Sequence, residues 1–228
     1  HKKMQGLIGP LKELAEFEEL CKNKKKDAGM IRVCGCVNSQ KSHMMYALGD
    51  GCKYKVIACS SETKAKQIYE EYRFLDSNTY LYPAKDFLFY QADIRSKELV
   101  KQRMEGIQAV LSGEPVTVVT SLDGFMDHLA PKESIAEKVL KIQNDSVLKL
   151  DEMAEKLSVI GYDREVQVEG PGQFAVRGGI LDIYPLTEEL PVRIELWGDE
   201  VDSIRTFDVE SQRSIENLMD IVIYPAVE

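Results

Sequence analysis

Histidine is scarce and scattered in this 228-residue sequence. His1, His43 and His128 form no pair at helical or turn spacing, so they do not resemble the ligands of a metal site. The five cysteines all precede residue 60, and they form neither a disulfide framework nor a paired C-x-x-C motif. We therefore expect reduced, mostly buried thiols and no bound metal.

Long apolar runs and an excess of basic charge are also missing. No run approaches the roughly 20 residues of a membrane-spanning helix, and the first residues lack the apolar core of a signal peptide. The formal net charge of −9 argues against nucleic-acid binding by the chain alone, because such binding usually needs a basic field. The one basic run, residues 22–26, is most simply a solvated loop, although it could contact DNA within a larger assembly. The chain is thus expected to be a globular, cytoplasmic protein.

Strand and helix patterns alternate through the first half of the chain. Apolar runs predict strands at residues 31–35, 54–60, 79–82 and 116–120. Residues 60–74 can form a helix capped by Ser60 or Ser61, and residues 96–111 carry apolar side chains at helical spacing, with Gly113 as a stop. This alternation is typical of an α/β fold, in which crossover helices connect the strands of a parallel sheet.

The pattern changes after about residue 136. Asp151 can cap a helix that ends at Gly161. Beyond it, strand patterns separated by turn residues cover residues 165–170, 173–179, 180–185, 191–198 and 201–208. We therefore predict two domains: a P-loop-like α/β domain with a parallel sheet over residues 1–136, and a smaller α+β domain with a mainly antiparallel sheet over residues 137–228.

Residues 35–42, GCVNSQKS, nearly match the phosphate-binding pattern G-x-x-x-x-G-K-[ST]. Gly35, Lys41 and Ser42 stand at the required spacing, but Gln40 replaces the second glycine. A side chain there obstructs the close approach of the backbone to phosphate and the positive φ that glycine allows. A nucleotide site also needs a second carboxylate for Mg²⁺, and the nearest acid after the strand at 116–120 is Asp123. We expect a degenerate loop that binds no nucleotide, and hence no cofactor.

One predicted strand separates apolar from polar side chains. In VRIELWG, alternation places Val192, Ile194 and Leu196 on one face and Arg193, Glu195 and Trp197 on the other. The aliphatic face is expected to pack in the core, which leaves the only tryptophan on the outer face. If the next strand pairs as a hairpin, Arg205 is a neighbour on that face. The tryptophan either covers the stems of its neighbours or, beside arginines, forms an interface hot spot.

Residues 172–214 resemble the domain shared by the transcription-repair coupling factors (Mfd) and the excision-repair protein UvrB. Their sequence, GQFAVRGGILDIYPLTEELPVRIELWGDEVDSIRTFDVESQRS, is closer to the coupling factors, particularly in FDVESQRS. The first half is similar to the same family through its strand order and through YPAKDFLFYQADIRSKELVKQRMEGIQAVLSGEPVTVVTSLDGF. The resemblance implies an N-terminal region of such a factor, without the RNA-polymerase-binding and DNA-translocase modules of the family.

By this resemblance the second domain docks the excision-repair protein UvrA, and the first corresponds to the UvrB nucleotide-binding domain with its chemistry lost. The UvrA-contacting positions of the family fall on Arg177, Arg193 and Trp197, and Arg205 and Glu195 are flanking candidates. Neither Arg193 nor Trp197 is assigned to the core, so truncating either is expected to weaken docking and to leave folding almost unchanged. The chain is expected to have no enzymatic activity of its own. The full-length family protein would reach RNA polymerase and DNA through the modules that are absent here.

The alternative is a UvrB-type fragment that binds ATP and damaged DNA. UvrB-like chains carry an intact Gly-Lys-Thr loop and a long aromatic-rich hairpin that clamps DNA. Only about a dozen residues separate Pro83 from the helix predicted at Ser96, which is too short for such a hairpin. Phe87, Phe89 and Tyr90 are therefore expected to pack between layers. The sequence favours an adaptor over this enzyme.

Overall fold

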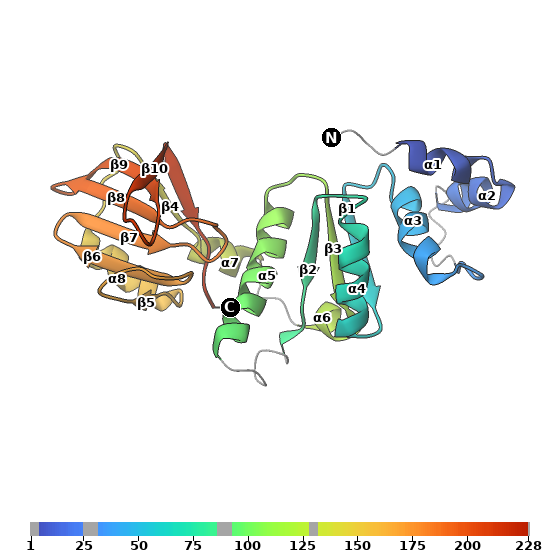
Figure 1. The fold of residues 1–228 in the computed structure, drawn as a ribbon, viewed down its shortest axis with the longest axis horizontal. Helices are drawn as coiled ribbons and strands as arrows, with labels where there is room; N and C mark the ends of the chain where they lie inside the picture. The colour runs from blue at the N-terminus through green and yellow to red at the C-terminus, as the bar shows by residue number, and fades with distance from the viewer. Residues whose placement is uncertain (1–4, 25–31, 86–92, 128–131, 228) are drawn as a thin grey trace. The chain divides into compact units, whose positions relative to one another are not determined.

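The computed structural model describes residues 5–24, 32–85, 93–127 and 132–227 (Figure 1). The chain divides into two compact units, of which one consists of residues 1–84 and 109–126 and the other of residues 85–108 and 127–228. The first unit contains a parallel sheet with helices, and the second contains a mainly antiparallel sheet. The predicted fold class is therefore confirmed. The predicted domain boundary between residues 136 and 137 stays a prediction, because a unit that is compact in the structure need not fold as an independent domain.

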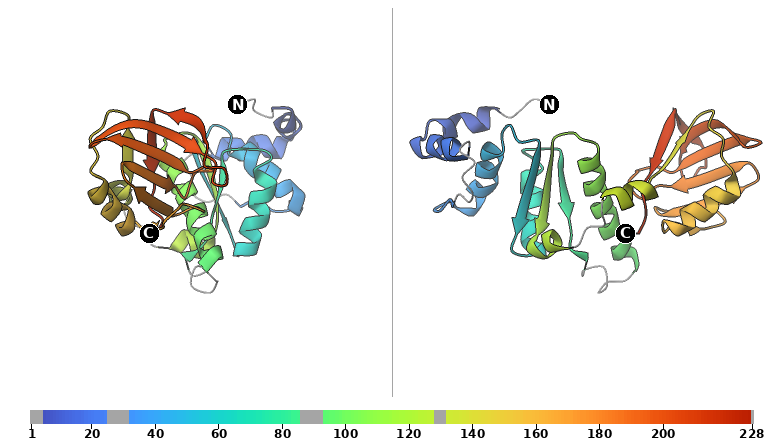
Figure 2. Two further views of the ribbon diagram at one scale, coloured as in Figure 1. Left: turned by 60° about the vertical axis from the view of Figure 1, so that its left-hand side comes forward. Right: turned by 180° about the vertical axis from the view of Figure 1, so that it is seen from behind.

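Three parallel strands form the sheet of the first unit (Figure 2). In spatial order they are β1 (Tyr54–Cys59), β3 (Val116–Ser121) and β2 (Thr79–Tyr82). Helix α4 (Glu62–Tyr72) covers one face of this sheet and begins where the sequence predicts, because the Ser61 hydroxyl accepts a hydrogen bond from the Lys64 N–H at 3.2 Å. Ala65 and Ile68 of this helix pack against Val119 of the central strand.

A second apolar cluster in the first unit lies among its early helices. The remaining helices of the described part of this unit are α1 (Gln5–Lys12), α2 (Ala15–Lys24), α3 (Asn38–Leu48) and α6 (Leu122–Met126). Ile8, Phe17 and Ala47 from α1, α2 and α3 are buried together. The near-P-loop leads into α3, and Ala47 anchors this helix in the cluster.

The strand predicted at residues 31–35 is wrong. Residues 32–37 have no regular structure, and the side chains of Val33 and Cys34 are exposed. A strand is stabilised by paired backbone groups and by the burial of alternate side chains. In this short run, neither Val33 nor Cys34 is buried. The described parallel sheet consequently has β1 at one edge.

Asp76 connects three segments of the first unit. Its Oδ2 accepts hydrogen bonds from Lys55 Nζ on β1 at 2.9 Å and from Thr117 Oγ1 on β3 at 3.0 Å. Its Oδ1 accepts a hydrogen bond from the Asn78 N–H at 3.1 Å. Burial by itself raises the pKa of the Asp76 carboxyl, but Lys55 and the other donors outweigh burial and hold this pKa below its usual value.

We expect Asp76→Asn to lower the free energy of unfolding of the first unit by about 2 kcal/mol, because hydrogen bonds to a charged acceptor are lost. In the wild type this contribution is complete above the unfolded pKa near 4, and it is lost as the pH falls through the lower folded value. Urea unfolding at neutral and acid pH should therefore show a weaker acid dependence in the variant. The exposed Asp123 supplies the control, since Asp123→Asn removes the same charge without this network. An unaltered acid dependence in Asp76→Asn would contradict the prediction.

Six strands form the larger sheet of the second unit. In spatial order they are β10 (Ser214–Leu218), β9 (Glu200–Phe207), β8 (Val192–Trp197), β7 (Ile180–Tyr184), β6 (Gln173–Arg177) and β5 (Asp163–Arg164). Neighbouring strands are antiparallel, except that β5 and β6 are parallel. A separate antiparallel pair consists of β4 (Leu140–Gln143) and β11 (Asp220–Ile223). The described helices with residues in this unit are α5 (Asp93–Leu111), α7 (Lys132–Lys138) and α8 (Leu150–Val159).

One apolar cluster joins α8 to the inner face of the six-stranded sheet. Met153 and Leu157 of α8 belong to the same buried cluster as Phe174, Ile183 and Ile194 of the strands. This packing fixes which strand residues face the core and which face outward.

The ends of α8 only partly follow the prediction. Gly161 stands just after the helix with a φ of +94°, so it is the predicted stop. Asp151 is not the cap, because α8 begins at Leu150 and Lys149 occupies the capping position, where its side chain makes no capping hydrogen bond to the helix backbone. Asp151 instead lies in the first turn, where the helix dipole favours a carboxylate.

Candidate partner-docking surface

The predicted docking residues lie on the outer face of the six-stranded sheet, which is opposite the core. On β8, Val192 and Ile194 are buried in the core cluster and Leu196 packs against it. Arg193 and Trp197 therefore point to the other side, as the alternation predicts. We define the outer face by the side chains of Ala175, Arg177, Asp182, Arg193, Glu195, Trp197, Arg205 and Phe207, which the strand register brings together.

A buried carboxylate lies at the centre of the outer face. The Asp182 side chain is only 2% exposed, and it accepts hydrogen bonds from both predicted arginines. Arg193 donates from Nε to Oδ1 at 2.7 Å and from Nη2 to Oδ2 at 2.8 Å, which is a bidentate pair. Arg177 donates from Nη2 to Oδ2 at 3.1 Å. The structure thus joins Arg177 and Arg193, which are in different strands, through one acid.

Arg193 is less accessible than the sequence suggested. Its side chain is 13% exposed, its guanidinium lies 4.4 Å from the centre of the Phe207 ring, and its Nη2 also donates to Gln212 Oε1 at 2.8 Å. Hydrogen bonding to Asp182 raises the pKa of the Arg193 guanidinium above its ordinary value. From the sequence, truncating Arg193 was expected to leave folding almost unchanged, because this side chain was not assigned to the core. That reason is wrong, since the Arg193 side chain neutralises a buried acid.

Arg177 and Trp197 are the accessible members of the three predicted contacts. Arg177 is 48% exposed and Trp197 is 85% exposed. Arg177 stands just before the hairpin turn Gly178–Gly179, and Trp197 stands just before the hairpin turn Gly198–Asp199. A hydrogen bond from the Leu196 N–H to the Gly179 carbonyl at 2.8 Å joins the two hairpins near these turns. A tryptophan so exposed cannot be covering its neighbours' stems. Its exposure favours the alternative interpretation, an interface residue.

The flanking candidates Arg205 and Glu195 form a half-buried ion pair on the same face. Arg205 stands directly opposite Arg193 in the register of β9 and β8, as the predicted hairpin requires. Its Nε is buried and makes no hydrogen bond to any described residue. Arg205 thus retains a donor that is not satisfied within the described chain.

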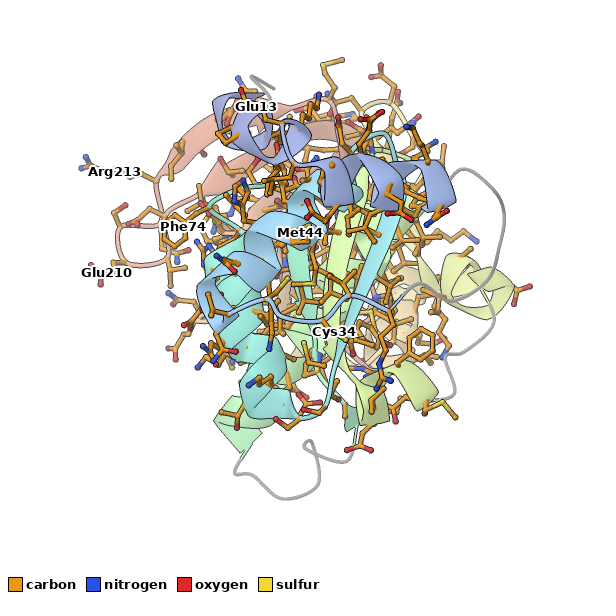
Figure 3. All side chains as sticks on the ribbon, turned by 90° about the vertical axis from the view of Figure 1, so that its right-hand side faces the viewer. Glu13, Cys34, Met44, Phe74, Glu210 and Arg213 are labelled. Atoms are coloured by element: carbon orange, nitrogen blue, oxygen red, sulfur yellow. The ribbon has the colours of Figure 1, made fainter. Side chains whose placement is uncertain are left out.

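Sequence reasoning missed Asp182, Phe207 and Gln212. Asp182 had a detectable signal, because it is the single acid within the apolar strand ILDIY and alternates with the core residues Leu181 and Ile183. Gln212 had none, since its role depends on a left-handed backbone with a φ of +59° in the loop after β9. Two other side chains of this loop, Glu210 and Arg213, point away from the ribbon (Figure 3).

The near-P-loop has no phosphate cradle of the usual kind. Gln40 lies in the first turn of α3, where its side chain accepts a hydrogen bond from the Val37 N–H at 3.3 Å. Lys41 Nζ donates to Asn38 at 3.1 Å, and the buried Ser42 hydroxyl donates to Glu71 of α4 at 2.9 Å. Gln40 is helical, so the positive φ discussed for this position is not needed; Gly35 adopts it instead, at +88°. The lysine and serine that would hold phosphate and Mg²⁺ have protein partners.

We expect Lys41→Ala to change neither nucleotide binding nor partner binding, because Lys41 only contacts the start of its own helix. Isothermal titration of the wild type with ATP and Mg²⁺ should give no saturable heat at micromolar concentrations. Saturable binding that Lys41→Ala abolishes would contradict this interpretation of the loop.

The described part of the chain shows neither a metal-ligand cluster nor a membrane-spanning helix. The described ranges contain no group of three or more His, Cys, Asp or Glu side chains that could hold a metal ion. Among the helices that the structure describes, none has the length and apolar character needed to cross a membrane. Phe87, Phe89 and Tyr90 lie outside the described residues, so their predicted packing stays a prediction.

Comparison with known proteins shows similarity over the second unit and over most of the chain. Residues 140–228 match the UvrB interaction domain, and this match covers all six strands of the larger sheet. The chain is also 34% identical to the transcription-repair-coupling factor of Bacillus subtilis over 221 residues, which are 96% of the chain. Along nearly its whole length, the chain is thus similar to one region of a transcription-repair-coupling factor. The resemblance predicted from the sequence is therefore confirmed.

Other relatives agree over a shorter part of the chain. The transcription-repair-coupling factor of Staphylococcus epidermidis is 38% identical over 66% of the chain, and that of Staphylococcus aureus is 36% identical over 68%. The chain spans 19% of the length of the Bacillus subtilis protein and 13% of the length of each staphylococcal protein. The similarity thus concerns one region of much longer proteins.

Proposed function

We propose that the chain is an adaptor that recruits UvrA to stalled transcription complexes and works in the cytoplasm. Residues 137–228 form the docking domain, and Arg177 and Trp197 contact UvrA directly. Arg193 supports this surface, and Arg205 and Glu195 flank it. RNA polymerase and DNA are partners of the full-length protein through regions outside residues 1–228.

The observation that carries this proposal is the coincidence of an exposed tryptophan and arginine with the UvrB interaction domain. The domain match and the larger sheet cover the same residues, and Trp197 is the chain's only tryptophan. An exposed aromatic and an exposed arginine on the same face of a sheet are typical of a binding hot spot. Free N–H groups on Arg177 suit a carboxylate on the partner.

The proposal assigns no ATPase activity to this chain. Lys41 and Ser42 bond to neighbouring side chains, and Gln40 occupies the position of a required glycine. The rival function of a UvrB-type ATP-dependent fragment would need these groups to hold a nucleotide and Mg²⁺.

The test is a titration of purified UvrA with the chain by calorimetry, with ATP binding to the chain measured in parallel. The adaptor function predicts saturable UvrA binding and no ATP binding by the chain. ATP binding without any UvrA binding would support the rival instead. Arg32 provides a matched control for Arg177, because it is an exposed arginine in the first unit, and Arg32→Ala should leave UvrA binding unchanged.

A further inference from the structure

We infer that Asp182 and Gln212 are positioning residues that hold the two arginines of the outer face in their binding arrangement before a partner arrives. The inference rests on the proposed function only in naming UvrA as the partner. It concerns residues that lie beneath the contact surface or beside it, and it explains why two arginines from different strands act together.

Asp182 is placed to orient both side chains at once. Its two oxygens accept three hydrogen bonds, of which two come from Arg193 and one from Arg177. Arg193 therefore uses its planar fork on Asp182, whereas Arg177 spends a single N–H there and keeps its other donors for solvent or a partner. The buried acid thus fixes the direction of the exposed cation.

Gln212 holds Arg193 from the opposite side. Its Oε1 accepts a hydrogen bond from Arg193 Nη2 at 2.8 Å, and its own Nε2 donates to the Val209 carbonyl at 2.8 Å. The φ of +59° is unfavourable for a residue with a side chain, so the rest of the loop must enforce it. Asp208 does so, because its carbonyl accepts from the Gln212 N–H at 2.8 Å and its N–H donates to the Arg213 carbonyl at 2.9 Å.

The resulting chain of contacts runs from the loop after β9 to the hairpin tip beside Arg177. Gln212 bonds to Arg193, Arg193 to Asp182, and Asp182 to Arg177, while the Phe207 ring supports Arg193 from beneath. A side chain fixed in its bound conformation loses less entropy on association, so the network raises affinity without contacting the partner.

The test uses Gln212→Gly, because glycine accepts the left-handed backbone and removes only the side-chain contact. The full chain should stay folded, while its affinity for UvrA falls by up to about tenfold, the order of loss expected when an interface side chain is no longer held in its bound conformation before binding. Asp145→Gly is the matched control, since Asp145 is the other described residue besides glycine with a positive φ, at +63°, and it is not on the outer face. Gln212→Glu keeps an acceptor for Arg193 and should restore most of the affinity.

A second measurement follows the arginines themselves. In ¹⁵N nuclear magnetic resonance spectra of the free chain, the Arg193 Nε–H should exchange slowly with water, and Gln212→Gly should speed this exchange and shift the Arg177 signal. Unchanged arginine signals, or an unchanged UvrA affinity beside altered signals, would overturn the inference. If the wild type does not bind UvrA at all, the proposed function fails, and the signals alone decide whether Gln212 and Asp182 position the arginines.

Discussion

Trp197→Ala should lower the affinity of the chain for UvrA by about thirtyfold, which corresponds to a loss of about 2 kcal/mol or more. The reason is that a large aromatic side chain contributes much apolar area and excludes water from the neighbouring ion pairs of an interface. The free energy of unfolding should stay nearly constant, because the side chain is 85% exposed in the free chain. Calorimetric titration and urea unfolding of the same preparation measure both quantities.

Phe74 supplies the control for Trp197. It is an aromatic residue of the first unit that is 78% exposed, and it stands away from the ribbon (Figure 3). Phe74→Ala removes a comparable apolar surface and should leave UvrA binding intact. Wild-type affinity in Trp197→Ala would refute the docking surface, whereas a large loss of stability would indicate a structural tryptophan.

Arg193→Ala should lower the free energy of unfolding of the second unit by about 3 kcal/mol, because removing one partner of a buried ion pair leaves a buried charge uncompensated. Asp182 would retain only the single hydrogen bond from Arg177. UvrA affinity should fall as well, because Asp182 loses the bidentate partner that fixes its own orientation and therefore holds Arg177 less firmly. Urea unfolding followed by circular dichroism measures the first effect, and calorimetric titration measures the second.

Arg205→Ala provides the comparison on the same face. Arg205 and Glu195 are both half-buried, so the loss of their ion pair should cost less than about 1 kcal/mol. An Arg193→Ala variant as stable as the wild type would show that the pair of Arg193 and Asp182 contributes little to stability.

Much of the fold could be predicted from local patterns, since each correct element carried its own signal. Ser61 marked the start of α4, Gly161 marked the end of α8, and alternation separated the two faces of β8. The strand at residues 31–35 failed because Val33 and Cys34 are exposed rather than buried, and burial is a property of the tertiary structure. The capping role of Asp151 failed because several residues near the start of a helix can serve, and the helix began at Leu150, two residues earlier than a cap at Asp151 would place it.

The sequence predicted which residues belong to the proposed docking surface, but it did not predict the role of each residue. Strand alternation placed Arg193 and Trp197 outward, and the family resemblance added Arg177. The alternation of side chains along a strand assigns every second residue to the outer face in the same way. It therefore could not distinguish the exposed Trp197 from Arg193, which is hydrogen-bonded to Asp182 and Gln212. That distinction depends on cross-strand contacts and on one left-handed residue, and neither is visible in the local sequence.

The most direct test of the docking account is hydrogen–deuterium exchange of the chain with and without UvrA, read by mass spectrometry. The turns at the two hairpin tips, residues 178–179 and 198–199, are exposed, so their amides should exchange quickly in the free chain. The account predicts that UvrA slows exchange at these two tips and leaves residues 54–82 of the first unit unchanged. Slowed exchange confined to the first unit, with both tips unaffected, would contradict it.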